Sequence, residues 1–428
     1  PESIRGFSLD TRKIQSGFCF VALKSESRDG HDFLNDALAR GAACALTNRV
    51  VDCALPQLVV SDPLTAMAGI AAARRGEFSG PVVGITGSCG KTSTKEMLRL
   101  LLGGVKAHAT SGNWNNRIGV PMTLFDLDPA QHDFAVIEAG INQPGEMVLL
   151  GEMIKGDMTV LTNIGPAHLE LLGSLGGIAD EKSKLAEVAK ADSPIVLPID
   201  VLQYQAFSRF AGRCLAVRFD DASPSCSVRE LVDCRIELAK NGTVSTFSLG
   251  GHTYQVQTSS RGILQNAALA VVAARALGIE PEQIAERLRS WQPESTRGRI
   301  VTEKDAFYFI DCYNANPASM VDSLGAFQNA APPDLPRCYV IGAMNELGAC
   351  AVDFHVSVGK QVRLRKEDMA LFVGPAELTE AFSRGLQESG ASNEQIQIAE
   401  SSSMIKSTVA DFKGALFLKG SRSYQLEQ

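Results

Sequence analysis

The middle of the chain alternates short apolar runs with amphipathic stretches. Three apolar runs have the length of buried strands and end in polar or small residues: Val82–Thr86, Phe134–Ala139 and Met158–Asn163. After the first run, apolar residues recur at helical spacing up to Leu101, and we expect Lys95, Glu96 and Arg99 on the outward face of that helix. Strands that alternate with helices favour a parallel, doubly wound α/β sheet, which binds ligands at the carboxyl ends of its strands.

The flanking regions have patterns of their own. Residues 1–79 mix apolar runs with helical stretches: Phe18–Leu23, Ala43–Thr47 and Gln57–Val60 against His31–Gly41 and Pro63–Arg75. From residue 297, strand-like runs again alternate with helical stretches: Phe307–Asp311, Cys338–Gly342, Leu371–Val373, Gln395–Ala399 and Ala415–Lys419. We therefore predict a small mixed α/β domain over residues 1–79, a central doubly wound domain over 80–296 and a Rossmann-like domain over 297–428.

Two further segments belong to the central domain. Ser227–Leu238 and Thr243–Thr258 alternate apolar and polar residues around Asn241-Gly242, which is a strong hairpin-turn signal. We expect a β ribbon there that decorates the domain. Ala267–Leu277 is the most hydrophobic helical segment, and because Arg275 interrupts it, it predicts a core helix.

Composition narrows the functional classes. The net charge is −7 and the pI is about 5.5, with no block of basic residues, which argues against a nucleic-acid partner. No apolar run approaches the roughly 18 residues of a membrane span. The 10 cysteines are scattered without metal-ligand spacing, which is typical of reduced cysteines and favours a cytoplasmic protein.

The clearest chemical motif is Thr-Gly-Ser-Cys-Gly-Lys-Thr-Ser at residues 86–93, between a predicted strand and a predicted helix. Such a loop binds phosphate because glycines let backbone N–H groups approach the oxygens at a helix N-terminus. The candidate nucleotide-binding residues are Gly87, Ser88, Gly90, Lys91, Thr92 and Ser93. Lys91 would reach the β- and γ-phosphates, and the Thr92 hydroxyl would bind Mg²⁺. The standard motif has glycine where Ile85 stands, so a glycine-rich turn without nucleotide is the alternative.

Two strand ends supply candidate metal ligands beside this loop. Glu138 lies at the end of Phe134–Ala139, and His168 follows Met158–Asn163. The carboxyl ends of parallel strands meet at one edge of a sheet. A carboxylate and an imidazole at that edge suit a cation that accompanies a nucleotide, although each residue alone would rank as an ordinary solvated or structural side chain.

Taken together, the motifs resemble the Mur ligases, ATP-dependent enzymes that form amide bonds in bacterial cell-wall synthesis. The resemblance covers nearly the whole chain in the same order, with matching segments at residues 10–12, 29–33, 86–93, 112–121, 137–142, 162–170, 311–320 and 419–422. The Asn-x-Asn-Asn and Tyr-Asn-Ala-Asn strings are specific to the branch that adds D-alanyl-D-alanine to a UDP-muramoyl tripeptide. The resemblance implies a UDP-sugar-peptide domain, an ATP domain and a C-terminal domain that binds the incoming amino substrate and closes over both.

The resemblance also implies metal ligands. Thr92 and Glu138 would hold a first Mg²⁺ and His168 a second. Lys182 matches the lysine that family members carry as a carbamate on the metal. Carbamylation converts a cation into an oxygen-donor anion that suits Mg²⁺. Taken alone, Lys182 would be one exposed lysine among several.

The remaining roles concern ATP and the other substrates. Arg299 matches the arginine that faces the γ-phosphate, Asp311 the carboxylate that contacts the ribose, and Asn266 the asparagine near adenine. Catalysis would then depend on Lys91, Glu138, His168, Lys182 and Arg299. The implied substrate-binding residues are Asp10, Thr11, Arg12, Asn113, Asn115, Asn116, Asn314, Asn316, Lys419, Ser421 and Arg422. Without the resemblance, these would be ordinary loop, cap and surface residues.

This sequence departs from the family pattern at two places. Gly262-Ile263 stands where relatives have a His-Asn pair, which bears on the nucleotide contacts. Ala343 stands where they have an aspartate, which bears on how the amino substrate is positioned.

The expected activity is an ATP-dependent, ADP-forming ligation through an acyl phosphate, by a monomer with small-molecule substrates. Three alternatives stay open. The chain could add a different amino acid or dipeptide within the same family, or bind a nucleotide sugar without catalysis. It could also be a P-loop ATPase or kinase that transfers phosphate to a small acceptor.

Overall fold

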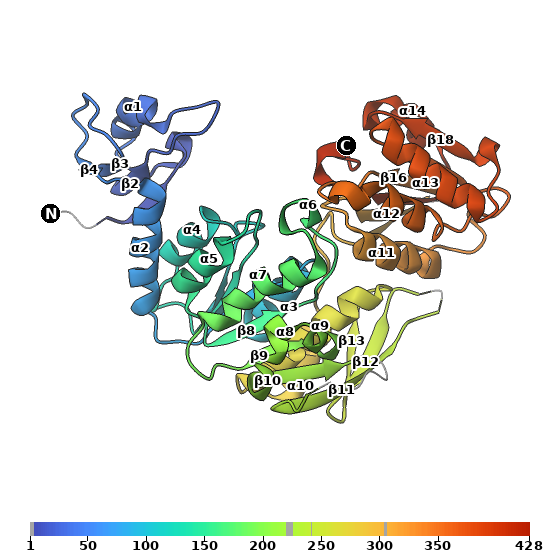
Figure 1. Ribbon diagram of the computed structural model, residues 1–428, viewed down its shortest axis with the longest axis horizontal. Helices are drawn as coiled ribbons and strands as arrows, with labels where there is room; N and C mark the ends of the chain where they lie inside the picture. The colour runs from blue at the N-terminus through green and yellow to red at the C-terminus, as the bar shows by residue number, and fades with distance from the viewer. Residues whose placement is uncertain (1–3, 220–225, 241, 304–305) are drawn as a thin grey trace.

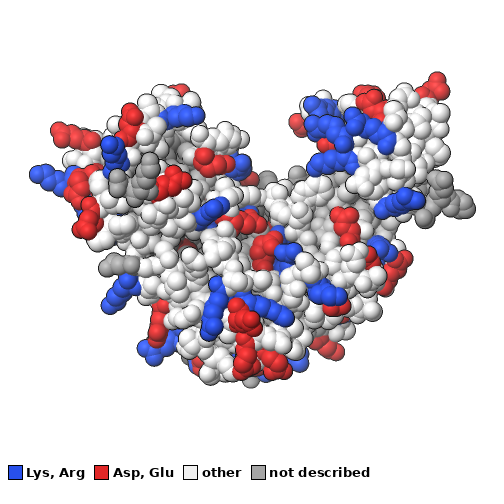
Figure 2. All heavy atoms as spheres, turned by 180° about the vertical axis from the view of Figure 1, so that it is seen from behind, with Lys and Arg blue, Asp and Glu red and all other residues white. Residues whose placement is uncertain are grey.

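The computed structural model describes residues 4–219, 226–240, 242–303 and 306–428, which form three α/β lobes (Figure 1). Their sheets have four, nine and six strands in chain order. The N-terminal and C-terminal lobes lie at opposite ends of the central lobe, and the molecular surface is hollowed between them (Figure 2). The α/β class with three successive units is thereby confirmed. The domain boundaries after residues 79 and 296 stay a prediction.

The central sheet has the order β13-β12-β11-β10-β9-β8-β5-β7-β6. Its strands are β5 (Val82–Thr86), β6 (Ala107–Ala109), β7 (Phe134–Glu138), β8 (Met158–Leu161), β9 (Ile195–Pro198), β10 (Cys214–Arg218), β11 (Glu230–Glu237), β12 (Ser245–Leu249) and β13 (His252–Val256). Strands from β11 to β6 are parallel. Strand β5 lies between β7 and β8, so the chain crosses to opposite sides from its carboxyl end. Doubly wound sheets bind ligands at such a switch point.

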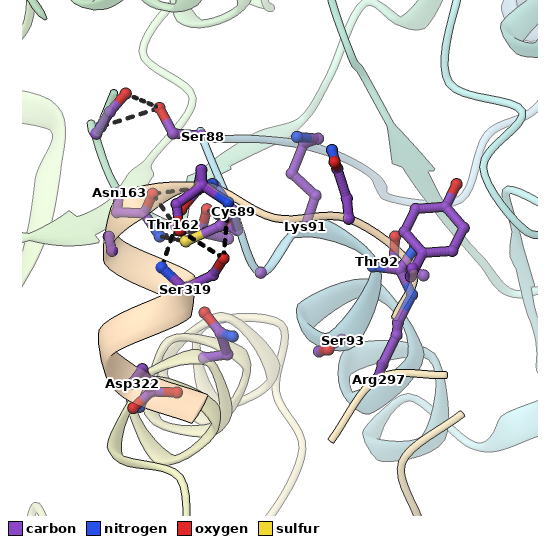
Figure 3. Close-up of a pocket in the computed structure, with 18 of the residues that line it drawn as sticks. Ser88, Cys89, Lys91, Thr92, Ser93, Thr162, Asn163, Arg297, Ser319 and Asp322 are labelled. Atoms are coloured by element: carbon purple, nitrogen blue, oxygen red, sulfur yellow. Dashed lines mark hydrogen bonds between the residues drawn. The ribbon is translucent and has the colours of Figure 1, made fainter. Parts of the chain in front are cut away.

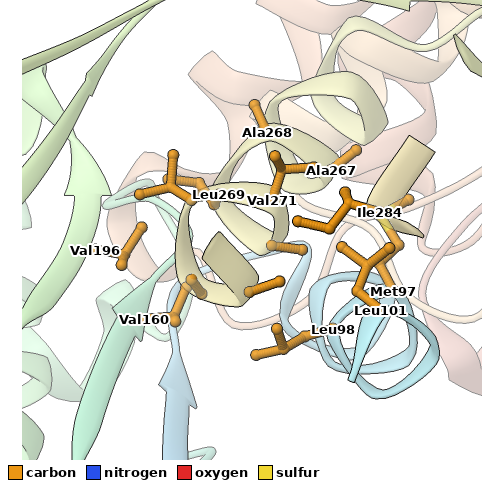
Figure 4. Close-up of a cluster of buried hydrophobic side chains, with 14 of the residues drawn as sticks. Met97, Leu98, Leu101, Val160, Val196, Ala267, Ala268, Leu269, Val271 and Ile284 are labelled. Atoms are coloured by element: carbon orange, nitrogen blue, oxygen red, sulfur yellow. The ribbon is translucent and has the colours of Figure 1, made fainter. Parts of the chain in front are cut away.

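Helices cover both faces of this sheet. They are α3 (Lys91–Leu101), α4 (Gly119–Phe125), α5 (Glu146–Ile154), α6 (Leu169–Leu172), α7 (Leu175–Glu187), α8 (Gln205–Ser208), α9 (Arg261–Ala276) and α10 (Pro281–Arg289). Val83 and Ile85 pack in the cluster that α3, α9 and α10 build, part of which Figure 4 shows. The alternate residue Val82 packs with Ile137 among α4 and α5. Both faces are buried, which is why these strands form continuous apolar runs.

One position on α3 corrects the expectation from sequence. Lys95 is 0% exposed, whereas Glu96 and Arg99 lie at the helix surface and approach each other at 3.7 Å. The Lys95 ammonium is buried because it donates to two backbone carbonyls of a neighbouring loop. Helical periodicity indicates which face of the helix a residue occupies. It cannot show that carbonyl groups from a distant segment cover that face, which is why the prediction for Lys95 was wrong.

The expected β ribbon is part of the central sheet and does not decorate it. Strand β11 is parallel to β10, and β12 lies between β11 and β13 and is antiparallel to both. The stretch expected as one strand over Thr243–Thr258 is divided by Gly250 and Gly251, whose positive φ values of 57° and 82° suit a tight hairpin turn. Asn241 of the predicted turn lies outside the described residues.

The N-terminal lobe has a parallel sheet in the order β1-β2-β3-β4. Its elements are β1 (Gly6–Ser8), β2 (Phe18–Val21), β3 (Cys44–Thr47), β4 (Gln57–Val59), α1 (Leu34–Ala39) and α2 (Pro63–Gly76). Asp62 caps α2, and Pro63 occupies its first turn. Phe7 stacks on Phe125 of α4 with 3.9 Å between ring centroids. Arg75 of α2 donates to the Ile154 carbonyl, so the lobe is fixed to the central lobe along α2.

The C-terminal lobe has the order β14-β15-β19-β16-β17-β18, parallel except for β14. Its elements are β14 (Arg299–Glu303), β15 (Ala306–Asp311), β16 (Arg337–Gly342), β17 (Met369–Val373), β18 (Ile396–Ala399), β19 (Ala415–Lys419), α11 (Pro317–Ala330), α12 (Ala351–Gly359), α13 (Ala376–Glu388) and α14 (Lys406–Asp411). Phe309, Phe327 and Phe417 form its aromatic core. Within the described residues, no helix has the length and apolar character that crossing a membrane requires.

Candidate active site

A cavity of about 680 Å³ lies between the central and C-terminal lobes. Its wall on the central side contains the 88–93 loop, Glu138 and His168, at the carboxyl ends of β5, β7 and β8. Its other wall contains the start of α11 and the end of β19. Figure 3 shows loop residues Ser88, Cys89 and Lys91 together with Ser319 and Asp322 of α11. The switch point of the central sheet therefore opens into an interdomain cavity.

The loop after β5 has the backbone geometry of a phosphate cradle. Gly90 precedes α3 with φ 78°, and a Cβ there would lie 2.5 Å from the Asn266 side chain. A Cβ at Gly87 would lie 1.8 Å from the Thr162 hydroxyl. Asn163 holds the loop by accepting from the Cys89 N–H and donating to the Cys89 carbonyl, each at 3.1 Å. The first N–H groups of α3 have no partners within the helix and border the cavity, which suits an anion.

Lys91 and Thr92 place polar groups at this helix start. The Lys91 ammonium donates to the Gly87 carbonyl at 2.8 Å, so it lies across its own loop. Burial lowers the pKa of Lys91, and the guanidinium of Arg297 adds to this effect. The charge of Glu138 opposes this shift, and an incoming phosphate would add further negative charge beside this half-buried cation. The Thr92 hydroxyl is buried beside it and borders the cavity.

Glu138 presents an unpartnered carboxylate oxygen. The side chain is 1% exposed, its Oε1 accepts from the Asn115 amide at 2.7 Å, and its Oε2 has no hydrogen-bond partner. A buried carboxylate with a free oxygen is unfavourable unless a cation or donor joins it. Glu138 therefore fits Mg²⁺, with the Thr92 hydroxyl as a second ligand. Among the described residues, no three His, Cys, Asp or Glu side chains form a metal cluster, so phosphate oxygens and water would complete the shell.

His168 lies on the cavity wall and contacts the C-terminal lobe. Its Nδ1 is 2.6 Å from Oε2 of Glu346, and the Glu170 N–H donates to the Glu346 carbonyl at 3.4 Å. The hydrogen bond from His168 lowers the pKa of the Glu346 carboxyl. A ring whose Nδ1 is held by a carboxylate has Nε2 left as a metal ligand. The expected His168 site is thus one that both lobes build.

Lys182 lies behind the cavity, on α7, and does not line it. The side chain is 1% exposed and has no ion pair among the described residues. Burial lowers its pKa well below the ordinary value, and the positive charge of Lys91 lowers it further. Lys182 is therefore a buried amine beside the phosphate loop. It is not the exposed lysine that the sequence alone favoured.

Polar side chains of α9, β15 and α11 line another part of the cavity. Asn266 of α9 is buried against Gly90. Asp311 accepts from Lys419 and from the Ser323 hydroxyl, both at 2.6 Å. Asp322 of α11 accepts from the Ser260 hydroxyl at 2.5 Å and from the Gly262 N–H at 2.9 Å, and burial raises its pKa. A Cβ at Gly262 would lie 3.0 Å from Asp322, so this departure from the family pattern makes room for an interdomain contact.

The expected arginine at the phosphates is not at the cavity. Arg299 begins β14 with an exposed side chain, whereas Arg297 borders the cavity. The Arg297 guanidinium, labelled in Figure 3, lies 3.6 Å from the ring centroid of Tyr313. It also pairs with Glu294 at 3.0 Å. Arg299 belongs to the edge strand of the C-terminal sheet and does not line the cavity in this arrangement of lobes.

The expected substrate residues divide into two groups. Those that line the cavity are Asn113, Asn115, Asn116, Asn314, Asn316 and Lys419. Those outside it are Asp10, Thr11, Arg12, Ser421 and Arg422. In the N-terminal lobe, Asp10 pairs with Arg12 at 2.7 Å, and Arg422 pairs with Glu427 in the C-terminal lobe. The UDP-sugar segment therefore lies apart from the phosphate loop in this arrangement of lobes.

Sequence reasoning missed four residues that shape this site: Lys95, Arg297, Asp322 and Glu346. Glu346 is three residues after Ala343, and Arg297 is two residues before Arg299. Their closeness to these family positions is the feature of the sequence that could have identified them. The helical pattern predicts that Lys95 lies on the outward face, and it makes no prediction for Asp322. Their partners come from distant segments, and no local pattern identifies them.

Two family models match the chain. The Mur ligase middle domain matches residues 85–274, and the Mur ligase glutamate ligase domain matches residues 296–422. The chain is 34% identical to the UDP-N-acetylmuramoyl-tripeptide–D-alanyl-D-alanine ligase of Synechocystis sp. over 89% of this chain and 82% of that protein. It is 32% identical to the ligase of the same name from Escherichia coli over 98% of this chain and 92% of that protein.

Solved structures agree with these sequence matches. A MurF crystal structure from Acinetobacter baumannii has a TM-score of 0.85 and 26% identity, covering 100% of this chain and 93% of that one. The MurF ligase of Thermotoga maritima in complex with ADP has a TM-score of 0.81 and 26% identity, covering 99% and 96%. Since relatives above 30% identity match over most of their length, and their fold is this fold, the chain belongs to the Mur ligase family.

Proposed function

We propose that this protein adds D-alanyl-D-alanine to UDP-N-acetylmuramoyl-tripeptide with hydrolysis of ATP to ADP, a step in peptidoglycan precursor synthesis. The observation that carries the proposal is one interdomain cavity in which a phosphate cradle, the free Glu138 oxygen and a row of amide side chains meet. The relatives above 30% identity have names that state this reaction. ATP use agrees with the ADP complex of a structural relative.

The reaction has two balanced steps. The terminal carboxylate of the tripeptide attacks the γ-phosphorus of ATP, which gives an acyl phosphate and ADP. The amine of D-alanyl-D-alanine then attacks the acyl carbon, loses a proton, and inorganic phosphate leaves from the tetrahedral intermediate. The protein supplies mainly position and charge neutralisation, because both steps gather negative charge at fixed places.

The cavity residues divide this work. The N–H groups of α3 and the Lys91 ammonium bind the β- and γ-phosphates. Thr92 and Glu138 would hold Mg²⁺, and His168 would hold a second ion. When bound, such ions would supply positive charge that neutralises the transferring phosphoryl group. Asn266 and Asp311 bind the nucleoside, and Asn113, Asn115 and Asn116 orient the sugar peptide.

We further propose that Lys182 is carbamylated. Its neutral amine attacks CO₂, forms an N–C bond and releases one proton, which leaves a carbamate anion. The lowered pKa supports this reaction, since only the unprotonated amine is nucleophilic. The new anion would lie near the positive charge of Lys91, and its oxygens suit Mg²⁺.

The test is release of ADP and phosphate by purified protein with each substrate omitted in turn. We expect turnover only with ATP, Mg²⁺, the UDP-tripeptide and D-alanyl-D-alanine together. If another amino acid in place of the dipeptide stimulates ADP release, the protein belongs to a different branch of the family. The buried Ala343 is the reason to test this, because relatives have an aspartate at that position. UDP-tripeptide binding without ADP would indicate lost catalysis. Absence of a hydroxamate when hydroxylamine traps the first step would indicate a simple kinase.

Cytoplasmic location and action as a monomer stay predictions from the sequence. Size-exclusion chromatography with light scattering measures the oligomeric state directly.

A further inference from the structure

Lys95 is a buried cation that the reaction scheme above does not use. It lies one helical turn beyond Lys91 on α3 and is 0% exposed. Its ammonium donates to the Thr110 carbonyl at 2.6 Å and to the Gly112 carbonyl at 3.0 Å, and lies 3.0 Å from Oε1 of Glu96. All three donor positions thus have an oxygen nearby.

The two carbonyls begin the loop that joins β6 to α4. This loop, residues 110–118, carries Asn113, Asn115 and Asn116 to the cavity. Lys95 donates to the carbonyls on either side of Ser111, just before the first of these asparagines. The ammonium therefore attaches the substrate loop to the same helix whose start forms the phosphate cradle.

The start and the middle of the loop are also attached to Glu138 and Gly140, at the end of β7. The Thr110 hydroxyl accepts from the Glu138 N–H at 2.9 Å, and the Asn115 amide donates to Oε1 of Glu138 at 2.7 Å. The Asn115 carbonyl accepts from the Gly140 N–H at 2.8 Å. A shift of the loop would therefore move the carboxylate as well as the asparagines.

Stability alone gives a weak reason for a lysine here. Removing an ammonium from water is unfavourable, and an apolar side chain of similar volume often stabilises a core equally well. What an apolar side chain lacks is the ability to hold two carbonyls at fixed places through charge-assisted hydrogen bonds. A lysine at position 95 is therefore better explained by its fixing of the two loop carbonyls than by its contribution to stability.

We propose that Lys95 is a positioning residue that fixes the 110–118 loop, so that Asn113, Asn115 and Asn116 meet the UDP-sugar peptide with Glu138 already oriented. It touches neither substrate nor ATP. The nature of the substrate rests on the proposed function, whereas the attachment of the loop does not.

The chain offers two matched controls. Arg75 is also a buried cation that donates to backbone carbonyls, those of Ile154, Phe78 and Lys155, but it lies at the junction of α2 with the central lobe, away from the cavity. Arg75→Met therefore reports the effect of losing a buried cation on stability. Glu96→Gln removes only the ion pair and leaves both carbonyl contacts of Lys95.

The experiment compares Lys95→Met, and the shorter polar Lys95→Gln, with these controls. We expect both Lys95 variants to raise KM for the UDP-tripeptide about tenfold or more, with KM for ATP changed by less than about threefold. Arg75→Met should lower the melting temperature without raising KM for the UDP-tripeptide relative to KM for ATP. Glu96→Gln should behave as the wild type.

A second readout needs no turnover. Trp114 lies in the loop at 41% exposure, whereas the other tryptophan, Trp291, is 5% exposed. Acrylamide quenching of Trp114, with each variant's Trp114→Phe partner as background, should increase in both Lys95 variants and in neither control. Folded Lys95 variants with wild-type quenching and KM, or equal shifts in Arg75→Met, would overturn the proposal. A wild type without ligase activity would instead overturn the proposed function, and the quenching result would still stand.

Discussion

Three lysines of the central lobe differ in burial and in neighbours: Lys95 and Lys182 are buried, and Lys91 is half-buried. The Lys91 ammonium donates to the Gly87 carbonyl of its own loop and lies where a phosphate could bind. Lys95 has carbonyl partners and a carboxylate. Lys182 has no ion pair among the described residues, and burial lowers its pKa well below the ordinary value. Because burial disfavours the charged form of an amine, the surroundings of Lys182 favour the neutral, nucleophilic form.

This difference predicts a dependence on CO₂. Formation of the carbamate consumes the neutral amine and releases a proton, so it is favoured as the pH rises through the lowered pKa of Lys182 and is reversed below it. We expect acid-treated enzyme, returned to neutral pH without CO₂, to recover activity only when bicarbonate is added. Lys182→Met should lose about a hundredfold or more in kcat and gain nothing from bicarbonate.

The control for this prediction is Lys190→Met, which changes an exposed lysine that pairs with Asp157. It should respond to bicarbonate as the wild type does. Full activity in CO₂-free buffer after acid treatment would contradict carbamylation.

Arg297 and Arg299 predict separate effects on binding and turnover. Arg297 borders the cavity and lowers the pKa of Lys91, whereas Arg299 faces solvent. Arg297→Ala should weaken ATP binding to the free enzyme about tenfold, the size of one charge-assisted contact. Arg299→Ala should leave that affinity unchanged and lower kcat about a hundredfold or more, because the lobe brings it in later. Calorimetry and steady-state kinetics measure the two, and equal loss of ATP affinity in both variants would refute the distinction.

At the scale of elements, the junction of β5 and α3 concentrates the binding geometry. The helix supplies N–H groups, and Gly90 supplies a left-handed backbone that lets Asn266 of α9 approach. Strands β7 and β8 end on either side and bring Glu138 and His168 toward it. The parallel order of these strands is what places all of these groups at one edge.

A glycine substitution tests this junction. Gly90→Ala should lower ATP affinity at least about tenfold, because φ 78° disfavours a side chain by roughly 1 kcal/mol and the new Cβ would meet Asn266 at 2.5 Å. Gly69→Ala, inside α2 with no atom within 4 Å of the new Cβ, should raise the free energy of unfolding by about 0.5–1 kcal/mol and leave ATP affinity unchanged. Nucleotide titration and chemical denaturation measure the two effects, and an unaffected Gly90→Ala would argue against the cradle.

At the scale of the whole molecule, polar contacts on both sides of the cavity join the central and C-terminal lobes. His168 meets Glu346, and Asp322 meets Ser260 and Gly262. The N-terminal lobe contributes nothing to the cavity wall in the described part of the chain, and it is attached along α2. If residues 10–12 contact the UDP-sugar as predicted, we expect a movement of lobes to bring them closer to the phosphate loop, as in other enzymes whose sites close on their substrates.

Such a movement predicts a smaller molecule in the ternary complex. Small-angle X-ray scattering should show a lower radius of gyration when the UDP-tripeptide and a non-hydrolysable ATP analogue bind together than with either alone. An unchanged radius with both ligands bound would mean that the open arrangement is itself the catalytic one.

Local patterns in the sequence determined the alternation of strands and helices, the phosphate loop and its place after β5, and the positions of Glu138 and His168 at neighbouring strand ends. Periodicity and turn chemistry act over a few residues, and parallel topology then fixes which ends meet. The tertiary structure alone decided that Lys95 and Lys182 are buried, that Arg297 rather than Arg299 borders the cavity, and that Glu346 holds His168. Each of these depends on partners far away in the chain, and desolvation and hydrogen bonding to such partners leave no trace in a local pattern.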